Sequence, residues 1–281
     1  MPFSCAHPTG SRDQFEFGKN WRAFLSTVDE QSIRSAESSL VDMLSTETLQ
    51  GKRFLDVGCG SGLFSLAARN LGAVVHSFDY DRAAVACTEE LKRRFRATDN
   101  EWTIQEGSVL NSDYLSSLGT WDVVYSWGVL HHTGDLWRAL DLVPELVGPR
   151  GQLFIAIYND QGGTSRRWLR IKRLYNRLPS ALRPMLVFLV AAVFESYYAL
   201  VRLMRGRNPL PFSDWQQKKR DRGMSAWHDW VDWVGGLPFQ VAKPEQIVVP
   251  LRQRGFVLDK LVTCLGGHAC NQYVLQRVES V

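Results

Sequence analysis

A glycine-rich stretch decides how this chain folds, and it reads Leu55-Asp56-Val57-Gly58-Cys59-Gly60-Ser61-Gly62. A strand-like run, residues 53–57, leads into the glycines, and an apolar run of helical character, residues 63–68, follows them. The order of strand, tight turn and helix is the first unit of an α/β sheet. Because glycine has no Cβ atom, the backbone of such a turn can adopt positive φ angles and approach a ligand closely.

Strand-like and helix-like segments continue to alternate after this turn. Further strands are expected over residues 73–78, 102–105, 122–126 and 152–158, with helices up to residue 96 and over residues 136–146. A helix over residues 243–254 and strands over residues 256–263 and 271–277 follow near the C-terminus. We therefore predict an α/β, Rossmann-like fold with a mostly parallel seven-stranded sheet, an antiparallel C-terminal hairpin and a helical insertion.

The same pattern divides the chain into four segments. We expect an N-terminal helical lid over residues 1–50, a Rossmann-like core that contains the glycine turn over 51–160, a basic and apolar helical insertion acting as a substrate lid over 161–240, and a helix and strands that complete the sheet over 241–281. The apolar run of the insertion, residues 185–201, contains one charge and falls short of the roughly 20 residues that cross a bilayer. It predicts a buried or interfacial helix.

Composition narrows the class of protein. The 281 residues are 45% hydrophobic and 22% charged, which excludes a disordered chain, a collagen-like repeat and a polytopic membrane protein. Five cysteines without regular spacing do not indicate a disulfide framework. The first thirty residues are charged throughout and lack the apolar core of a secretory signal. We expect a cytoplasmic protein that the insertion could attach to a membrane.

Charge is distributed unevenly along the chain. The net charge is +4, yet residues 161–222 carry 14 Lys and Arg against three acids, so the remainder is net negative. A basic segment of this kind is typical of a surface for an anionic partner, although a solvated helix face gives the same pattern.

Three interpretations of the insertion stay open. Its helices could enclose a small-molecule or lipid-linked acceptor while resting on an anionic membrane. The same charges could bind RNA, but they flank an apolar helix and no RNA-binding motif accompanies them, so nucleic acid is the less favoured partner. The apolar run could also form a homodimer. The sequence does not separate the membrane from the dimer.

Two acids beside the glycine turn narrow the choice of cofactor. Asp79 ends the second strand, where a carboxylate can accept hydrogen bonds from both ribose hydroxyls. Asp56 lies two residues before the first glycine, where it would repel a pyrophosphate but could stabilise an ammonium group. The glycine spacing, every second residue from 58 to 62, also differs from the G-x-G-x-x-G of dinucleotide folds.

Residues 55–62 resemble the first motif of the class I S-adenosylmethionine-dependent methyltransferases. Residues 125–132 resemble the small-molecule branch of these enzymes, which includes quinone-biosynthetic O-methyltransferases, and the resemblance covers roughly residues 50–158 and the C-terminal strands. It implies S-adenosylmethionine as the cofactor, with Asp56 and the glycines at its methionine moiety and Asp79 at its ribose. The implied cofactor-binding residues are Asp56, Gly58, Cys59, Gly60, Gly62, Asp79, Tyr80, Ser108, Val109 and Trp127.

The adenine site departs from the family pattern. The family often has an acid after the third strand, whereas this chain has Ser108 followed by Val109. Ser108 could hydrogen-bond the base, with Val109 on one face of the ring and Tyr80 on the other. Plain packing explains Tyr80 and Val109 equally well.

Three histidines are candidate catalytic bases. Methyl transfer to a hydroxyl is a displacement at a sulfonium methyl with loss of one proton, which a histidine can accept. His131 and His132 follow the fourth strand, at the sheet edge where ligands bind. His132 is preferred because its position is more loop-like, packing or helix capping is the alternative role for either, and His228 of the insertion is a third candidate. No ligand set with metal-binding spacing is evident, so we predict no metal.

Aromatic residues are candidates for closing over the substrate. These are Phe17 and Trp21 near the N-terminus, Tyr158 at the end of the fifth strand and Trp227 in the insertion, the last at helical spacing from other tryptophans. We predict O-methylation of a small or lipid-like acceptor. N-methylation of a small metabolite, RNA methylation and a non-enzymatic S-adenosylmethionine sensor are the alternatives.

Overall fold

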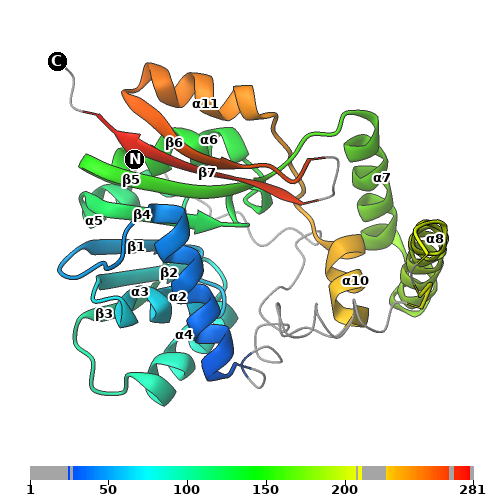
Figure 1. Cartoon of the computed structure of the whole chain (residues 1–281), viewed down its shortest axis with the longest axis horizontal. Helices are drawn as coiled ribbons and strands as arrows, with labels where there is room; N and C mark the ends of the chain where they lie inside the picture. The colour runs from blue at the N-terminus through cyan, green and yellow to red at the C-terminus, as the bar shows by residue number, and fades with distance from the viewer. Residues whose placement is uncertain (1–24, 26–27, 207, 211–225, 266–268, 279–281) are drawn as a thin grey trace, which may run out of the picture.

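The computed structural model describes residues 25, 28–206, 208–210, 226–265 and 269–278 (Figure 1). Within them lies a seven-stranded sheet of order β3-β2-β1-β4-β5-β7-β6. Its strands are β1 Arg53–Val57, β2 Val74–Asp79, β3 Trp102–Glu106, β4 Trp121–Trp127, β5 Val147–Tyr158, β6 Phe256–Val262 and β7 Cys270–Arg277. Neighbours among β1 to β5 are parallel, and β7 is antiparallel to both β5 and β6. The predicted fold class is confirmed, including the antiparallel hairpin at one edge.

Helices cover both faces of the sheet. One face carries α2 Glu30–Leu44, α3 Leu63–Asn70 and α4 Arg82–Phe95, and the other carries α5 Ser112–Leu118, α6 Leu136–Leu142 and α11 Pro244–Gln253. Short 3₁₀ helices, η1 Leu130–His132 and η2 Val143–Leu146, flank α6. Two hydrophobic clusters, one on each face, therefore enclose the parallel strands, as the near-continuous apolar strands require.

Residues 30–44, which the sequence assigned to an N-terminal lid, belong to the core instead. The helix α2 begins after Asp29, whose side chain accepts a hydrogen bond from the backbone N–H of Ser32 at 2.8 Å. It buries Leu40 and Leu44 in the same cluster as α3. The candidate lid residues Phe17 and Trp21 lie outside the described part of the chain.

The insertion comprises α7 Gly163–Arg177, α8 Arg183–Met204 and α10 Ala226–Gly235, with the 3₁₀ helix η3 Ser180–Leu182 between α7 and α8. These helices stand beyond the carboxyl ends of the parallel strands, with α8 outermost (Figure 1). They have a hydrophobic cluster of their own, in which Trp168, Tyr175, Val187 and Val234 are buried.

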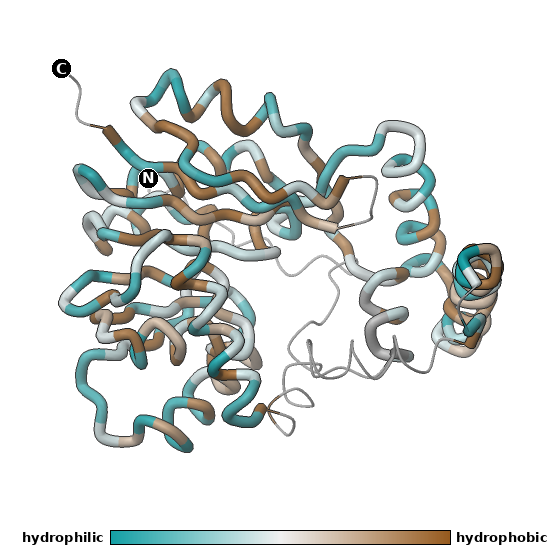
Figure 2. The backbone as a smooth tube through the Cα atoms, in the orientation of Figure 1, coloured by the Kyte–Doolittle hydropathy of each residue, from teal (hydrophilic) through white to brown (hydrophobic). Residues whose placement is uncertain are grey.

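The helix α8 is longer and more exposed than the sequence indicated. All of its 22 residues are described, and Val187 alone among them is buried. Much of it is coloured as hydrophobic in Figure 2 although it lies at the outer edge of the molecule. By length and composition alone, residues 180–204 could cross a membrane. The expectation of a buried helix is wrong, and the interfacial helix stays a prediction.

Candidate active site

The glycine loop joins β1 to α3 at the carboxyl edge of the sheet. Gly58, Gly60 and Gly62 have φ angles of +80°, +55° and +79°, which side chains with a Cβ rarely adopt. A Cβ on Gly58 would lie 2.4 Å from the side chain of Val129, and one on Gly62 would lie 2.7 Å from that of Thr88. The loop thus needs glycine both for its backbone conformation and for its close packing.

Asp79 ties the end of β2 to this loop. One carboxylate oxygen accepts the backbone N–H of Gly60 at 3.0 Å, and the other accepts that of Asp81 at 2.9 Å. A carboxylate has about four acceptor positions, so two are already used. Burial raises the pKa of Asp79 above its usual range. Asp79, the residue predicted to bind the ribose, is therefore held in place by the glycine loop itself.

Asp56 ends a chain of buried hydrogen bonds that crosses three strands and a helix. The indole N–H of Trp102 donates to Ser77 Oγ at 2.8 Å, Ser77 Oγ lies 2.7 Å from Ser65 Oγ, and Ser65 donates to the Asp56 carboxylate at 2.5 Å. Indole nitrogen is only a donor, so the hydroxyl hydrogens can all point toward Asp56. Burial raises the pKa of Asp56 to about 7, and the charge of Asp79 adds to the effect.

The donor and acceptor set fits S-adenosylmethionine. Asp56 and Asp79 are acids at the carboxyl ends of adjacent strands, on either side of a loop without side chains at three positions. A cationic ammonium or sulfonium suits the buried Asp56, because a nearby cation favours the ionised carboxylate. The remaining acceptor positions of Asp79 suit a ribose diol.

Cys59 lies within the loop, and Trp127 ends β4, the strand next to β1. Cys59 is buried, its sulfur accepts the hydroxyl of Thr88 at 3.3 Å, and burial raises the pKa of its thiol well above the usual value. It is therefore a neutral packing residue of the loop. Trp127 is 40% exposed at the end of β4, and its indole N–H donates to Gln272 on β7 at 3.2 Å.

The predicted adenine residues differ in exposure. Tyr80 is 59% exposed, next to Asp79, whereas Val109 is buried in the core cluster. The hydroxyl of Ser108 accepts the backbone N–H of Leu110 at 3.2 Å. Tyr80 is accordingly available to a ligand at the surface, and its packing role is not supported.

His131 is fully buried at the end of β4, in η1. Neither of its ring nitrogens has a hydrogen-bond partner among the described residues. Its ring centroid lies 3.9 Å from that of Tyr158, the candidate substrate residue on β5. Burial lowers the pKa of His131 well below its usual value, and His132 and Lys172 lower it further. His131 is therefore neutral at physiological pH.

His132 has a fixed tautomer. Its Nδ1 lies 2.6 Å from the carbonyl oxygen of Pro238, which can only accept, so Nδ1 carries the hydrogen and Nε2 carries the lone pair. Burial lowers the pKa of His132 to about 4, so the ring is neutral at physiological pH. A neutral imidazole with an oriented Nε2 can accept a proton from an acceptor hydroxyl.

The structure distinguishes among the candidate catalytic and substrate residues of α10. His228 lies on this helix, but its side chain is outside the described part of the structure. Trp227 is 44% exposed, whereas Trp233 packs edge-on against Tyr158 with ring centroids 5.6 Å apart. Trp233, nearly two helical turns beyond Trp227, is thus connected to the histidine pair through Tyr158.

Sequence reasoning missed Lys172 of α7. Its side chain is 1% exposed, its ammonium donates to the carbonyl of Trp233, and it lies 4.9 Å from the ring centroid of Phe239. In an arginine-rich helix it looked like one more surface charge. Its spacing from Trp168 and Tyr175, on the same helical face, was the signal that could have identified it.

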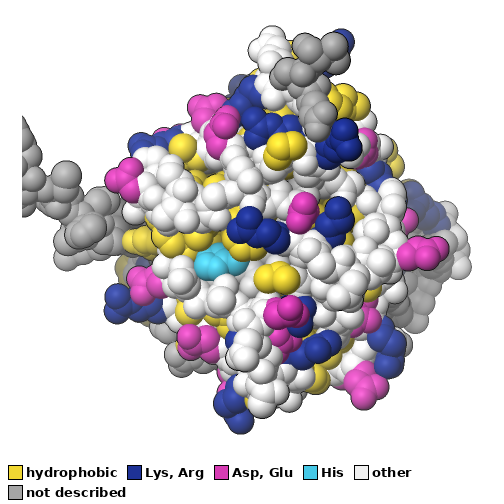
Figure 3. Space-filling model, turned by 90° about the vertical axis from the view of Figure 1, so that its left-hand side faces the viewer, with side chains coloured by type: hydrophobic (Ala, Val, Ile, Leu, Met, Phe, Trp, Pro, Cys, Tyr) yellow, Lys and Arg dark blue, Asp and Glu magenta, His cyan; other side chains and the backbone are white. Residues whose placement is uncertain are grey.

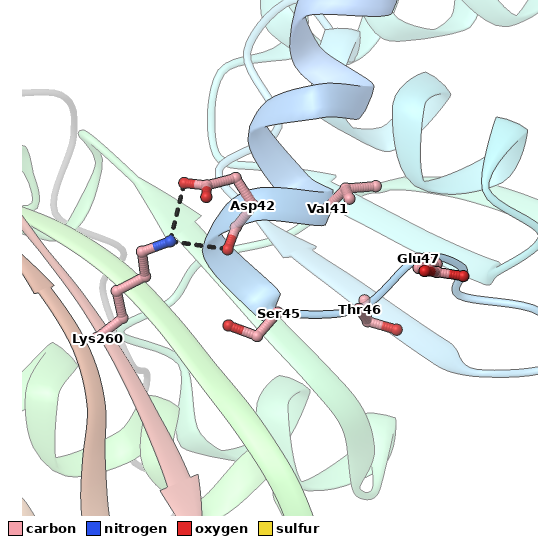
Figure 4. Close-up of a pocket in the computed structure, with 6 residues that line it drawn as sticks. All are labelled: Val41, Asp42, Ser45, Thr46, Glu47 and Lys260. Carbon is pink, nitrogen blue, oxygen red and sulfur yellow. Dashed lines mark hydrogen bonds and ion pairs between the residues drawn. The ribbon is translucent and has the colours of Figure 1, made fainter.

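The structure has two depressions of interest, one near the histidine pair and one far from it. A narrow cavity between β5 and the insertion is lined by Tyr158, Asn159, Ser165, Trp168, Trp233, Phe239 and Ala269. The other lies at the end of α2, where Lys260 pairs with Asp42 at 2.9 Å (Figure 4). The second precedes the amino end of β1, away from the glycine loop, whereas the first borders Tyr158, whose ring packs against His131.

A sequence model described as a methyltransferase domain matches residues 29–205, which is more than half of the chain. The chain therefore belongs to the methyltransferase-domain family. The predicted class I methyltransferase, with transferase chemistry and S-adenosylmethionine as its cofactor, is confirmed at the level of the family.

Individual relatives match more narrowly. The ubiquinone biosynthesis O-methyltransferase of Coxiella burnetii is 30% identical over 112 residues, which cover 40% of this chain and 46% of that protein. The chain thus spans about half the length of the curated relatives it matches.

Solved structures share the fold over most of the chain. Magnesium protoporphyrin IX methyltransferase from Synechocystis PCC 6803, with bound SAH, has a TM-score of 0.51 and 15% identity, covering 94% of this chain and 89% of that one. An O-methyltransferase family protein from Burkholderia thailandensis has a TM-score of 0.52 and 13% identity, covering 96% and 66%. At these identities the likeness concerns the fold.

Proposed function

We propose that this chain transfers a methyl group from S-adenosylmethionine to a hydroxyl oxygen of a small hydrophobic acceptor, with His132 as the base. The observation that carries the proposal is the hydrogen bond from His132 Nδ1 to the Pro238 carbonyl. It holds Nε2 as the proton acceptor, and the low pKa keeps that nitrogen unprotonated at physiological pH.

The packing of Val129 connects the predicted cofactor loop with the histidine pair. Val129, three residues before His132, lies against the glycine loop at Gly58. When bound, S-adenosylmethionine supplies a methyl group on a positively charged sulfur. Asp56 and Asp79 hold its charged and ribose ends, and the end of β4 brings the histidine pair beside the loop. This arrangement supports in-line attack by an acceptor placed next to His132.

The acceptor is an aromatic or quinol-type hydroxyl compound. Tyr158 packs against the histidine pair, and Trp233 and Phe239 pack against Tyr158, so aromatic rings that favour a flat apolar ligand lie next to the pair. The partial identity to ubiquinone biosynthesis O-methyltransferases supports the same class. Transfer to oxygen is favoured over transfer to nitrogen because a phenolic hydroxyl must lose a proton, for which His132 provides the acceptor.

The test replaces each histidine while preserving its surroundings. We expect His132→Gln to lower kcat roughly 10²- to 10⁴-fold with catechol or quinol acceptors, because the general base is lost. His131→Phe keeps a ring against Tyr158 and should lower kcat much less. Calorimetry should give unchanged S-adenosylmethionine affinity for both variants.

The pH dependence adds a second readout at saturating cofactor. Because the pKa of His132 is about 4, the base stays active well below pH 6.5, and kcat should not fall with the ordinary histidine pKa. Full kcat in His132→Gln, or a large loss only in His131→Phe, would remove His132 as the base. Methylation of amines but of no hydroxyl compound would replace the proposed acceptor class.

A further inference from the structure

The helix α8 presents an apolar face that the described chain leaves uncovered. Met185, Leu189, Val193, Leu200 and Met204 are 57%, 53%, 68%, 55% and 72% exposed. Their spacing is close to multiples of 3.6 residues, so they follow one side of the helix. A continuous exposed apolar stripe of this length marks an interaction surface.

The other side of α8 is fixed to the rest of the insertion. Val187 is buried, and Val190 and Phe194 pack in the same cluster as residues of α7 and α10. Phe194 stacks on Trp168 of α7 with ring centroids 5.2 Å apart. The helix therefore has one apolar face packed against the protein and another apolar face left open to a partner.

Positive charge accompanies the apolar stripe. Residues 163–206 contain nine Lys and Arg and a single acid, Glu195, which lies 3.5 Å from Arg202. On α7, Arg166, Arg170 and Arg173 are exposed along one side. Figure 3 shows a different pattern on the face of the core turned away from the insertion, where basic and acidic side chains are interspersed.

We propose that the insertion docks on an anionic lipid bilayer, with α8 lying in the interface and its open face among the acyl chains. The arginines of α7 and the end of α8 then meet lipid phosphates. A second copy of this chain would bring two strongly positive segments together, and RNA would leave the apolar stripe exposed. The anionic membrane satisfies both the charge and the apolar surface.

In this arrangement α8 lies along the membrane and does not cross it. Crossing would separate Val187 and Phe194 from their partners on α7 and α10. It would also draw toward the hydrocarbon a neighbouring helix, α7, with exposed arginines, whose transfer into lipid is unfavourable.

Membrane docking would place the lipid phase near the histidine pair. A series of ring contacts leads inward from α8: Phe194 to Trp168 at 5.2 Å, Trp168 to Trp233 at 5.3 Å, Trp233 to Tyr158 at 5.6 Å and Tyr158 to His131 at 3.9 Å. The narrow cavity lies along this series. If the proposed function holds, on which this step rests, a lipid-borne acceptor reaches the site from the membrane side.

The test is flotation of the full chain with phosphatidylcholine vesicles, with and without phosphatidylglycerol. We expect binding that requires phosphatidylglycerol and weakens with added salt, because screening shortens the reach of the arginines. The triple variant Arg166→Gln, Arg170→Gln, Arg173→Gln should weaken binding about fivefold for each arginine removed. Arg138→Gln, an exposed arginine on α6, is the control and should bind normally.

A second variant tests the apolar face. Leu189→Gln with Val193→Gln should weaken binding roughly tenfold or more, since both side chains leave water on docking. Val257→Gln, which replaces a 49% exposed apolar residue on β6, is its control. Light scattering without vesicles should show a monomer for all variants.

Several outcomes would overturn the membrane proposal. They are vesicle binding that ignores both sets of substitutions, no binding at low salt, a dimer that Leu189→Gln with Val193→Gln dissociates, and salt-sensitive binding to RNA but not to vesicles. Activity on a soluble short-chain acceptor separates this failure from that of the proposed function. The surface variants should methylate it normally, and they should lose activity only when the acceptor is in vesicles.

Discussion

The core and the insertion differ in how far their buried polar groups are hydrogen-bonded and in how far their apolar side chains are covered. In the core, Asp56, Ser65 and Ser77 complete one hydrogen-bonded chain, and the buried Arg69 pairs with Asp99 at 2.8 Å. Beside the insertion, His131 is buried with no hydrogen-bond partner among the described residues, and α8 keeps a long apolar face open. A buried polar group without a partner is unfavourable, as is an exposed apolar stripe. The difference favours the insertion side for contacts with an acceptor or a partner, whereas the cofactor residues belong to the core.

The hydroxyl of Tyr125 is an instructive exception within the core. It is fully buried on β4 without a hydrogen-bond partner in the described chain, and the charge of Asp56 raises its pKa beyond the effect of burial. The exception thus lies beside the cofactor acid and not in the packed layers away from it. Both regions leave polar groups unpaired near the candidate ligand sites.

The largest effect should come from the glycine loop. We expect Gly58→Ala to weaken S-adenosylmethionine binding roughly 10- to 100-fold, because the new Cβ would lie 2.4 Å from Val129 and overpacking costs about 1–3 kcal/mol. Gly119→Ala is the matched control, since Gly119 also has a positive φ but open space around it. Calorimetry measures both, and an equal loss of cofactor affinity in Gly119→Ala would contradict a local effect of the clash between the new Cβ and Val129.

A smaller effect should follow from the ionisation of Asp56. Because its pKa is about 7, affinity for the cationic cofactor should fall as pH falls from 8 to 6, by up to about tenfold per pH unit below the pKa. Asp56→Asn should bind more weakly and lose this pH dependence. Calorimetry across the range measures it, and a wild-type curve as flat as that of the variant would contradict the role of Asp56.

The raised pKa of Asp56 also determines how this carboxyl changes the free energy of unfolding with pH. The folded protein takes up the Asp56 proton at higher pH than the unfolded chain, whose carboxyl has a pKa near 3.8. The contribution of this carboxyl to the free energy of unfolding is therefore largest below pH 3.8 and decreases as pH rises toward 7. Other groups also titrate there, so wild type and Asp56→Asn must be compared by denaturant unfolding.

A substitution in the insertion should have the smallest effect on cofactor affinity. Trp168→Ala removes a buried ring from the cluster of α7, α8 and α10, a change that typically costs about 3–5 kcal/mol. We expect faster amide exchange in these helices and a severalfold higher KM for the acceptor, with cofactor affinity nearly unchanged. Trp137→Ala, at a 44% exposed site on α6, is the control. A large loss of cofactor affinity would show that the two regions are not separable.

Most of the fold was predictable because its signals are local. The glycine loop, the alternation of strands and helices and the acid at the end of β2 each lie within a few residues, and the structure has them where the sequence indicated. The strand predicted over residues 152–158 is longer in the structure. Strand β5 begins at Val147, because this residue pairs with Trp121 of β4 ahead of the apolar run.

The site was predictable only in part. The positions of Asp56 and Asp79 followed from the motif, but the partners of Asp56 come from β2, β3 and α3. The proposal of His132 over His131 as the base rests on the carbonyl of Pro238, which is more than 100 residues away along the chain. Lys172 has the sequence pattern of a surface cation, but α10 covers it in the folded chain.

The sequence by itself determined the α/β class, the glycine loop and the uneven charge, because backbone freedom, hydrophobic period and charge are properties of neighbouring residues. Tertiary structure alone decided that α2 joins the core, that α8 leaves one face open and that His132 has a fixed tautomer. Burial and hydrogen bonding depend on which distant segments meet. That information is not contained in any single stretch of chain.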